Sequence, residues 1–146
     1  MNKIILLILI LSFQVNLYSA NHIVKMLNQG AEGVMIFEPA ILKINTGDSV
    51  TFKSIDAAHN SASISSMIPN NAQAWNSDLS RDITVEFNIP GVYVYQCTPH
   101  VMMAMVGVIQ VGNDKSNLDT IKKAATQFKS VFVMNQSRLD DYLSKI

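Results

Sequence analysis

The chain has 146 residues, of which 49% are hydrophobic and 15% are charged, and its eleven Lys and Arg balance eleven Asp and Glu. A neutral chain without a basic run or a ladder of aromatic residues is not expected to bind nucleic acid. Its length suits one domain with a proper hydrophobic core.

Residues 1–20 have the features of a secretory signal peptide. Lys3 supplies a short basic start, and Ile4–Leu11 is an uninterrupted apolar run that small residues follow. The run is too short to span a bilayer comfortably, and no later segment is long and apolar enough to do so. We therefore expect cleavage near Ala20 or Asn21 and a soluble, periplasmic chain that leaves the membrane once the signal is removed. An uncleaved membrane anchor is the alternative.

Residues 21–112 predict short strands separated by turns. Ile83–Phe87 alternates cleanly between apolar and polar residues, and Val106–Val111 is a β-branched run. Ile41–Ile44 and Val50–Lys53 flank a polar turn that contains glycine, which predicts a hairpin. This spacing favours an all-β fold, a Greek-key antiparallel β-sandwich, over alternating strands and helices.

Residues 113–146 predict a helical extension packed on the same domain. A polar linker, Asn113–Asn117, opens it, and a second periodic segment covers about Val131–Leu143. We expect one or two C-terminal α-helices. The apolar residues at helical spacing in the first are Leu118, Ile121, Ala124, Ala125 and Phe128.

The only cysteine, Cys97, cannot form a disulfide within the chain, and an exposed thiol in an oxidising compartment is readily modified. His100 follows it at the spacing Cys-x2-His, and His59 comes just after a predicted strand, with Asn60 as a candidate brace for the loop. A sandwich can bring such loops together at one end. One thiolate, two imidazoles and a weak axial thioether form a blue copper site, whereas zinc usually takes four strong ligands. The residues therefore favour copper.

Three methionines follow His100, and the spacing leaves more than one candidate for the axial ligand. Met103 and Met105 are both workable. We favour Met105, because it adjoins the strand that begins at Val106 and would be held by a fixed backbone; Met102 is the weakest candidate.

Several short motifs follow one another from about Asn21 through the C-terminal helices. They are Met26-Leu27-Asn28, Gly30-Ala31-Glu32-Gly33, Phe37-Glu38-Pro39-Ala40, Gly47-Asp48, His59-Asn60, Met67-Ile68-Pro69, Pro90-Gly91, Cys97-Thr98-Pro99-His100 and Asn117-Leu118-Asp119. These motifs resemble those of pseudoazurins, small periplasmic blue copper proteins of the cupredoxin superfamily. The resemblance implies the ligands His59, Cys97, His100 and Met105, and a sandwich of about eight strands with two terminal helices.

The resemblance also implies a monomeric electron shuttle and not an enzyme. Its one-electron partners would be nitrite reductase or another periplasmic reductase, with a cytochrome c as donor. They would dock on an apolar patch around His100, which Met35 should border. Pseudoazurins often surround this patch with lysines, and uncharged residues replace them here at Gln29, Ala57, Asn76 and Gln96.

Two other functions fit the same residues. A copper carrier would use Met102, Met103, Met105 and Met67 as a soft cluster for Cu(I). A binding module with a buried, inert cysteine would retain no copper.

Overall fold

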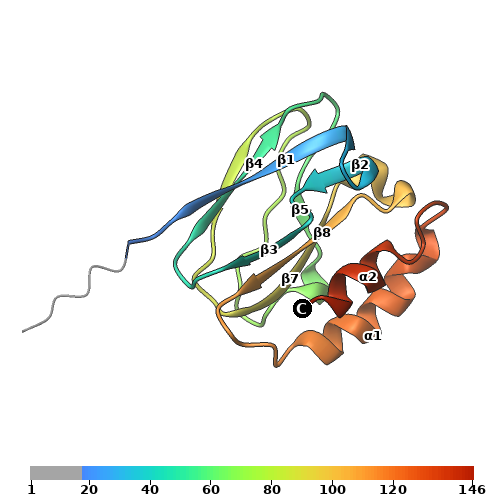
Figure 1. The fold of residues 1–146 in the computed structure, drawn as a ribbon. Coiled ribbons are helices and arrows are strands. Elements are labelled where there is room, and N and C mark those ends of the chain that lie inside the picture. The colour runs from blue at the N-terminus through green and yellow to red at the C-terminus, as the bar shows by residue number, and fades with distance from the viewer. Residues whose placement is uncertain (1–17) are drawn as a thin grey trace, which may run out of the picture.

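Over residues 18–146, the alternating segments of the sequence form eight strands in two four-stranded sheets that face one another, with two C-terminal helices against the second sheet (Figure 1). This computed structural model describes residues 18–146. Nearly all of the predicted signal peptide, residues 1–20, lies outside that range. Within residues 18–146 no helix is both long enough and apolar enough to cross a bilayer.

Each sheet combines strands that are far apart in the sequence. The first has the order β2 (Gly33–Glu38), β1 (Asn21–Gly30), β4 (Ser49–Ser54) and β6 (Ile83–Glu86). The second has the order β3 (Ile41–Ile44), β8 (Val106–Val111), β7 (Gly91–Gln96) and β5 (Ala62–Ser63). The predicted sandwich is confirmed, but both sheets are mixed: β1 pairs with β4, and β3 with β8, in parallel.

The predicted hairpin between Ile41–Ile44 and Val50–Lys53 is wrong, because β3 and β4 belong to different sheets. The glycine turn between them is a corner that carries the chain across the core. Gly47, at φ 92°, donates its amide to the carbonyl of Phe87 at 2.8 Å. Alternation of apolar residues is the same on both sides of a hairpin and of such a corner, so the pattern alone does not separate them.

The second sheet is buried on both faces, because the first sheet covers one face and the helices cover the other. Successive residues of β7 alternate between the two apolar clusters, with Tyr93 and Tyr95 in the core between the sheets and Val92 and Val94 under the helices. Side chains fill the interior closely: a Cβ atom on Gly107 would overlap the ring of Tyr95. Strands covered on both faces have nearly continuous apolar sequences, as these do.

The C-terminal extension forms α1 (Leu118–Phe128) and α2 (Arg138–Ser144). The two predicted terminal helices are therefore confirmed, although the second begins later than Val131. A short 3-10 turn, η3 (Lys129–Val131), and an irregular stretch of bends and turns come first. Two further 3-10 turns, η1 (Ser65–Met67) and η2 (Thr98–Met103), lie in the loops between strands.

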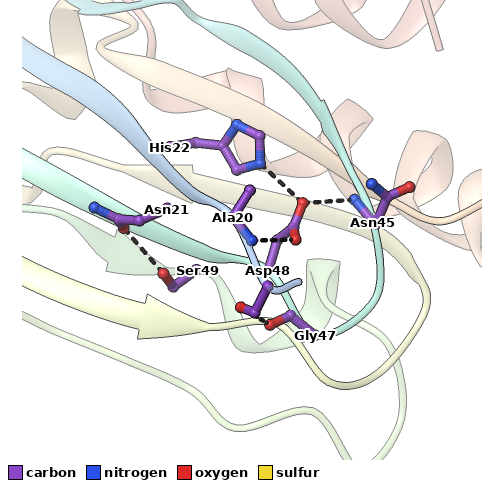
Figure 2. Close-up of polar contacts among 8 residues, drawn as sticks. Ala20, Asn21, His22, Asn45, Gly47, Asp48 and Ser49 are labelled. Carbon is purple, nitrogen blue, oxygen red and sulfur yellow. Dashed lines mark hydrogen bonds and ion pairs between the residues drawn. The ribbon is translucent and has the colours of Figure 1, made fainter. Parts of the chain in front are cut away.

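A buried carboxylate fastens the β3–β4 corner to the start of β1 (Figure 2). Asp48 is only 2% exposed, and its oxygens lie 2.8 Å from the amide of Ala20, 2.9 Å from Nε2 of His22 and 3.0 Å from the amide of Asn45. The hydrogen bond with His22, followed by that from Ala20, lowers the pKa of Asp48. Its ionised form therefore stabilises the folded state.

We predict that Asp48→Asn lowers the free energy of unfolding by about 1–3 kcal/mol near neutral pH, because buried donors lose a charged acceptor. The folded-state pKa is lowered, so this advantage of the wild type is complete above the ordinary carboxyl pKa of about 4 and disappears as the pH falls through the lowered value. Urea unfolding of the wild type and of Asp48→Asn, at pH values on both sides of the carboxyl pKa, measures this difference in the free energy of unfolding. Exposed Asp78→Asn is the control; an equal loss of stability in both variants would contradict the role of Asp48.

Candidate metal centre

Two loops at one end of the sandwich carry the predicted ligands. His59 lies in the connection between β4 and β5, directly after Ala58, whose backbone is left-handed at φ 67°. Cys97 directly follows the strand β7, and His100 lies in η2, where the backbone kinks at φ −114° and ψ 17°. The predicted Cys-x2-His spacing is therefore a single turn of 3-10 helix that follows a strand in which every residue but the last is buried.

The structure brings the sulfur and two imidazole nitrogens together. Cys97 Sγ lies 3.3 Å from His100 Nδ1 and 3.7 Å from His59 Nδ1, and the two Nδ1 atoms are 3.1 Å apart. Among the residues that the structure describes, these three form the only cluster of potential metal-ligating His, Cys, Asp or Glu side chains. Soft sulfur with two imidazoles is a donor set suited to copper.

His59 is oriented by its other ring nitrogen. Nε2 lies 3.0 Å from the side-chain oxygen of Asn28, which can only accept a hydrogen bond, so the proton resides on Nε2 and the lone pair of Nδ1 faces the cluster. Asn28 is itself held by its amide, which donates to Asp56 at 2.7 Å. Burial, and then the neighbouring charge of His100, lowers the pKa of His59 and favours the neutral imidazole that a metal requires.

Asn60 joins the two loops, as its position beside His59 suggested. Its Oδ1 accepts from the amide of Thr98 at 2.7 Å, and its Nδ2 donates to the hydroxyl of Thr98 at 3.1 Å and to the side-chain oxygen of Asn76 at 3.0 Å. Asn60 is only 5% exposed, so these bonds replace water that the side chain has lost. The predicted brace is confirmed.

The thiol of Cys97 is completely buried. Burial raises the pKa of Cys97, while the backbone amides of Asn60 and His100 oppose that shift by hydrogen bonding to the sulfur. An inert buried cysteine would also have a raised pKa. It would not, however, need two imidazole nitrogens directed at its sulfur.

The methionines of the loop differ in burial. Met105 is fully buried in the same apolar cluster as Cys97, its amide donates to the carbonyl of His100 at 3.3 Å, and its carbonyl accepts from the amide of Cys97 at 2.9 Å. Met103 is half-buried and Met102 is 54% exposed. Met67 belongs to the other cluster, under the helices.

Two parts of the site were not anticipated from the sequence. One is the role of Asn28 in orienting His59, although Asn28 belongs to one of the motifs that resemble those of pseudoazurins. The other is a set of hydrogen bonds from the C-terminal extension to the ligand loop, the loop that runs from His100 to Met105. Neither has a local signal, because each partner lies tens of residues away in the chain.

Comparison with known proteins agrees with this geometry. A model described as copper binding proteins, plastocyanin/azurin family, matches residues 24–112. A putative pseudoazurin from Rhizobium leguminosarum bv. viciae is 44% identical over 131 residues, covering 90% of this chain and 83% of that protein. The chain belongs to the pseudoazurin family. A second pseudoazurin, from Paracoccus pantotrophus, is 36% identical over 88% of this chain and 86% of its own length.

The crystal structure of pseudoazurin from Methylobacterium extorquens AM1 has the same fold, with a TM-score of 0.75 at 35% identity over 86% of this chain and 98% of that chain. Pseudoazurins are cupredoxins that transfer electrons and are not enzymes. The donor set of His59, Cys97 and His100, with Met105 beside it, fits one type 1 copper ion.

We predict that Asn60→Ala lowers the free energy of unfolding of the metal-free chain by about 1–3 kcal/mol, because several buried partners lose their hydrogen bonds. Chemical denaturation measures the change. Asn76→Ala is the matched control, since it removes only one of these bonds at an exposed side chain. If Asn76→Ala costs as much as Asn60→Ala, the link between the loops is not what stabilises this end.

Proposed function

We propose that this protein shuttles single electrons in the periplasm through one copper ion held by His59, Cys97, His100 and Met105. The observation that carries the proposal is the convergence of one thiol sulfur and two Nδ1 atoms within 4.8 Å of one another. The predicted signal peptide and the membership of the pseudoazurin family support the location and the role.

The bound metal would supply a one-electron couple, Cu(II)/Cu(I). The chain's own contribution is to hold the same donors in both states. Asn28 fixes the ring of His59, and Asn60 fixes the loop of Cys97, so neither ligand is free to reorient. Full burial of His59, Cys97 and Met105 keeps water from the site. Little structural change then accompanies each transfer.

Electrons would enter and leave through His100, because it is the one half-buried residue among His59, Cys97 and His100. Around it the loop offers apolar surface: Val101 is half-buried and Met102 is 54% exposed. Met35, predicted to border the patch, packs against the apolar cluster that contains Cys97 and Met105. Small contacts of this kind suit short encounters between redox proteins, since tight binding would slow turnover.

The copper carrier is the weaker alternative. A Cu(I) carrier would need its thioethers close together, but Met67 lies under the helices and Met102 points into solvent. The soft cluster that motivated this alternative is therefore not assembled, whereas the trigonal set is.

A visible spectrum of the copper-loaded chain tests the proposal. We predict an intense thiolate-to-Cu(II) charge-transfer band that disappears on reduction and returns on oxidation, with copper retained throughout. Cys97→Ser should lose this band, because the sulfur is its source. Retention of the band in Cys97→Ser, or loss of copper on reduction of the wild type, would contradict the electron-transfer role.

The visible spectrum and the reduction potential together test the choice of axial methionine. Met105→Leu should change the intensity ratio of the charge-transfer bands and the reduction potential, because an alkyl group replaces the buried thioether proposed as the axial ligand. Met103→Leu is the matched control and should leave both unchanged. The reverse result would assign the axial position to Met103.

We propose that the partner is a periplasmic reductase such as nitrite reductase, or another reductase, with a cytochrome c as donor. The four positions where lysines are common in pseudoazurins carry no charge here. Gln29, Ala57 and Asn76 are exposed, and Gln96 is half-buried. The docking face therefore offers little positive charge to steer an acidic partner.

We predict that the association rate with such a partner falls only slightly with added salt, by less than about threefold across the physiological range of ionic strength. Stopped-flow measurement of electron transfer at several salt concentrations gives this rate. Restoring lysine with Gln29→Lys and Ala57→Lys should make the dependence on salt steeper for an acidic partner. A steep fall in the unmodified chain would show that other charges steer docking.

A further inference from the structure

The C-terminal extension holds the loop that runs from His100 to Met105. Three successive backbone carbonyls of that loop accept hydrogen bonds from residues after α1. The carbonyl of Met102 accepts from the amides of Val133 at 2.8 Å and Met134 at 3.3 Å. The carbonyl of Met103 accepts from Nδ2 of Asn135 at 3.3 Å. The carbonyl of Ala104 accepts from Nη1 of Arg138 at 3.1 Å.

Arg138 is the most deeply placed of these donors. It opens α2 and is 8% exposed, and within residues 18–146 it takes part in no ion pair. Its guanidinium also donates to the carbonyls of Met35, at 3.0 Å, and Val34, at 3.3 Å. A buried guanidinium that donates to carbonyls of two separate segments connects them rigidly. Its N–H donors diverge from one planar group, the fork of the side chain, so the directions of the bonds to both segments are fixed.

The carbonyls that Arg138 joins belong to strained backbone. Met35 has φ 48° and Ala104 has φ 56°, both in the left-handed region that residues with a Cβ atom adopt at a cost. Ala104 directly precedes Met105, and its amide donates to the carbonyls of His100 and Val101. The conformation of Ala104 thus sets where the backbone of Met105 enters β8.

We propose that Arg138 is a positioning residue for the copper site: through the carbonyl of Ala104 it fixes the distance of Met105 from the other donors, and through Met35 it ties the docking face to the same point. The inference rests on the proposed ligand role of Met105. It assigns the C-terminal helix a part in setting the electronic structure of the site, beyond covering the sheet.

Arg138→Gln and Arg138→Lys in the full chain test this. Gln removes both the charge and the fork, whereas Lys keeps the charge and loses the fork. In the metal-free protein, amide hydrogen exchange at Ala104 and Met105 should become about tenfold faster in both variants, because a charge-assisted bond is lost. In the copper-loaded protein, the ratio of the charge-transfer bands and the rhombicity of the electron paramagnetic resonance spectrum should change in both.

Leu139→Ala is the matched control. Leu139 is fully buried on the same helix, so its truncation loosens α2 while leaving the bonds of Arg138 in place. At a temperature where every variant is folded, Leu139→Ala should keep the wild-type spectrum and the exchange rate of Met105. If Arg138→Gln fails to fold, Arg138→Lys against Leu139→Ala decides the question.

Three results would overturn the proposal. The first is that both arginine variants keep the spectra and the exchange rates of the wild type, and the second is that Leu139→Ala changes them as much as the arginine variants do. The third is a shift of reduction potential in Arg138→Gln alone, without a change in the spectra. The last would mean that the charge acts on the site and the geometry does not. Failure of the proposed function is distinguishable, because the wild-type chain would then lack the charge-transfer band, while exchange in the metal-free protein still measures the hold of Arg138 on the loop.

Discussion

The hydrogen bonds between Asn60 and Thr98 connect the two loops on which the metal centre depends. They are made by a side chain that is 5% exposed, so breaking them would leave polar atoms without water. One loop contributes His59, and the other contributes Cys97 and His100. Because the link is short and buried, the donor atoms of both loops are held at a fixed separation, and the chemistry of the site follows from that separation.

Around this link, further contacts hold two members of the donor cluster. Asn28 restrains His59, and Cys97 is held by the buried strand β7 that precedes it and by the hydrogen bond from its amide to the carbonyl of Met105. A site of this kind resists change when its charge changes, since each donor would have to break a hydrogen bond to move. That resistance is what a one-electron carrier needs, and it arises from polar contacts inside an apolar core.

The sequence was informative where the signal was local. Alternation and β-branched runs predicted the strands, helical spacing predicted one or two terminal helices, and the Cys-x2-His spacing placed Cys97 and His100 together. The sequence did not predict the placement of residues whose contacts are made with distant parts of the chain. The pattern on either side of Gly47 is the same for a hairpin and for a corner between sheets, and an arginine at the start of a helix ordinarily faces solvent. Arg138 instead reaches Met35, 103 residues earlier in the chain.

The parallel pairing of β3 with β8 has a consequence for how the molecule assembles. Residues 41–44 have no partner in their sheet until residues 108–111 are available, and the ligand loop lies just before that last strand. Closing so long a loop is entropically costly and slow compared with forming local turns. Because β8 lies between β3 and β7, a chain truncated before β8 would leave β3 without its partner and the second sheet without its centre.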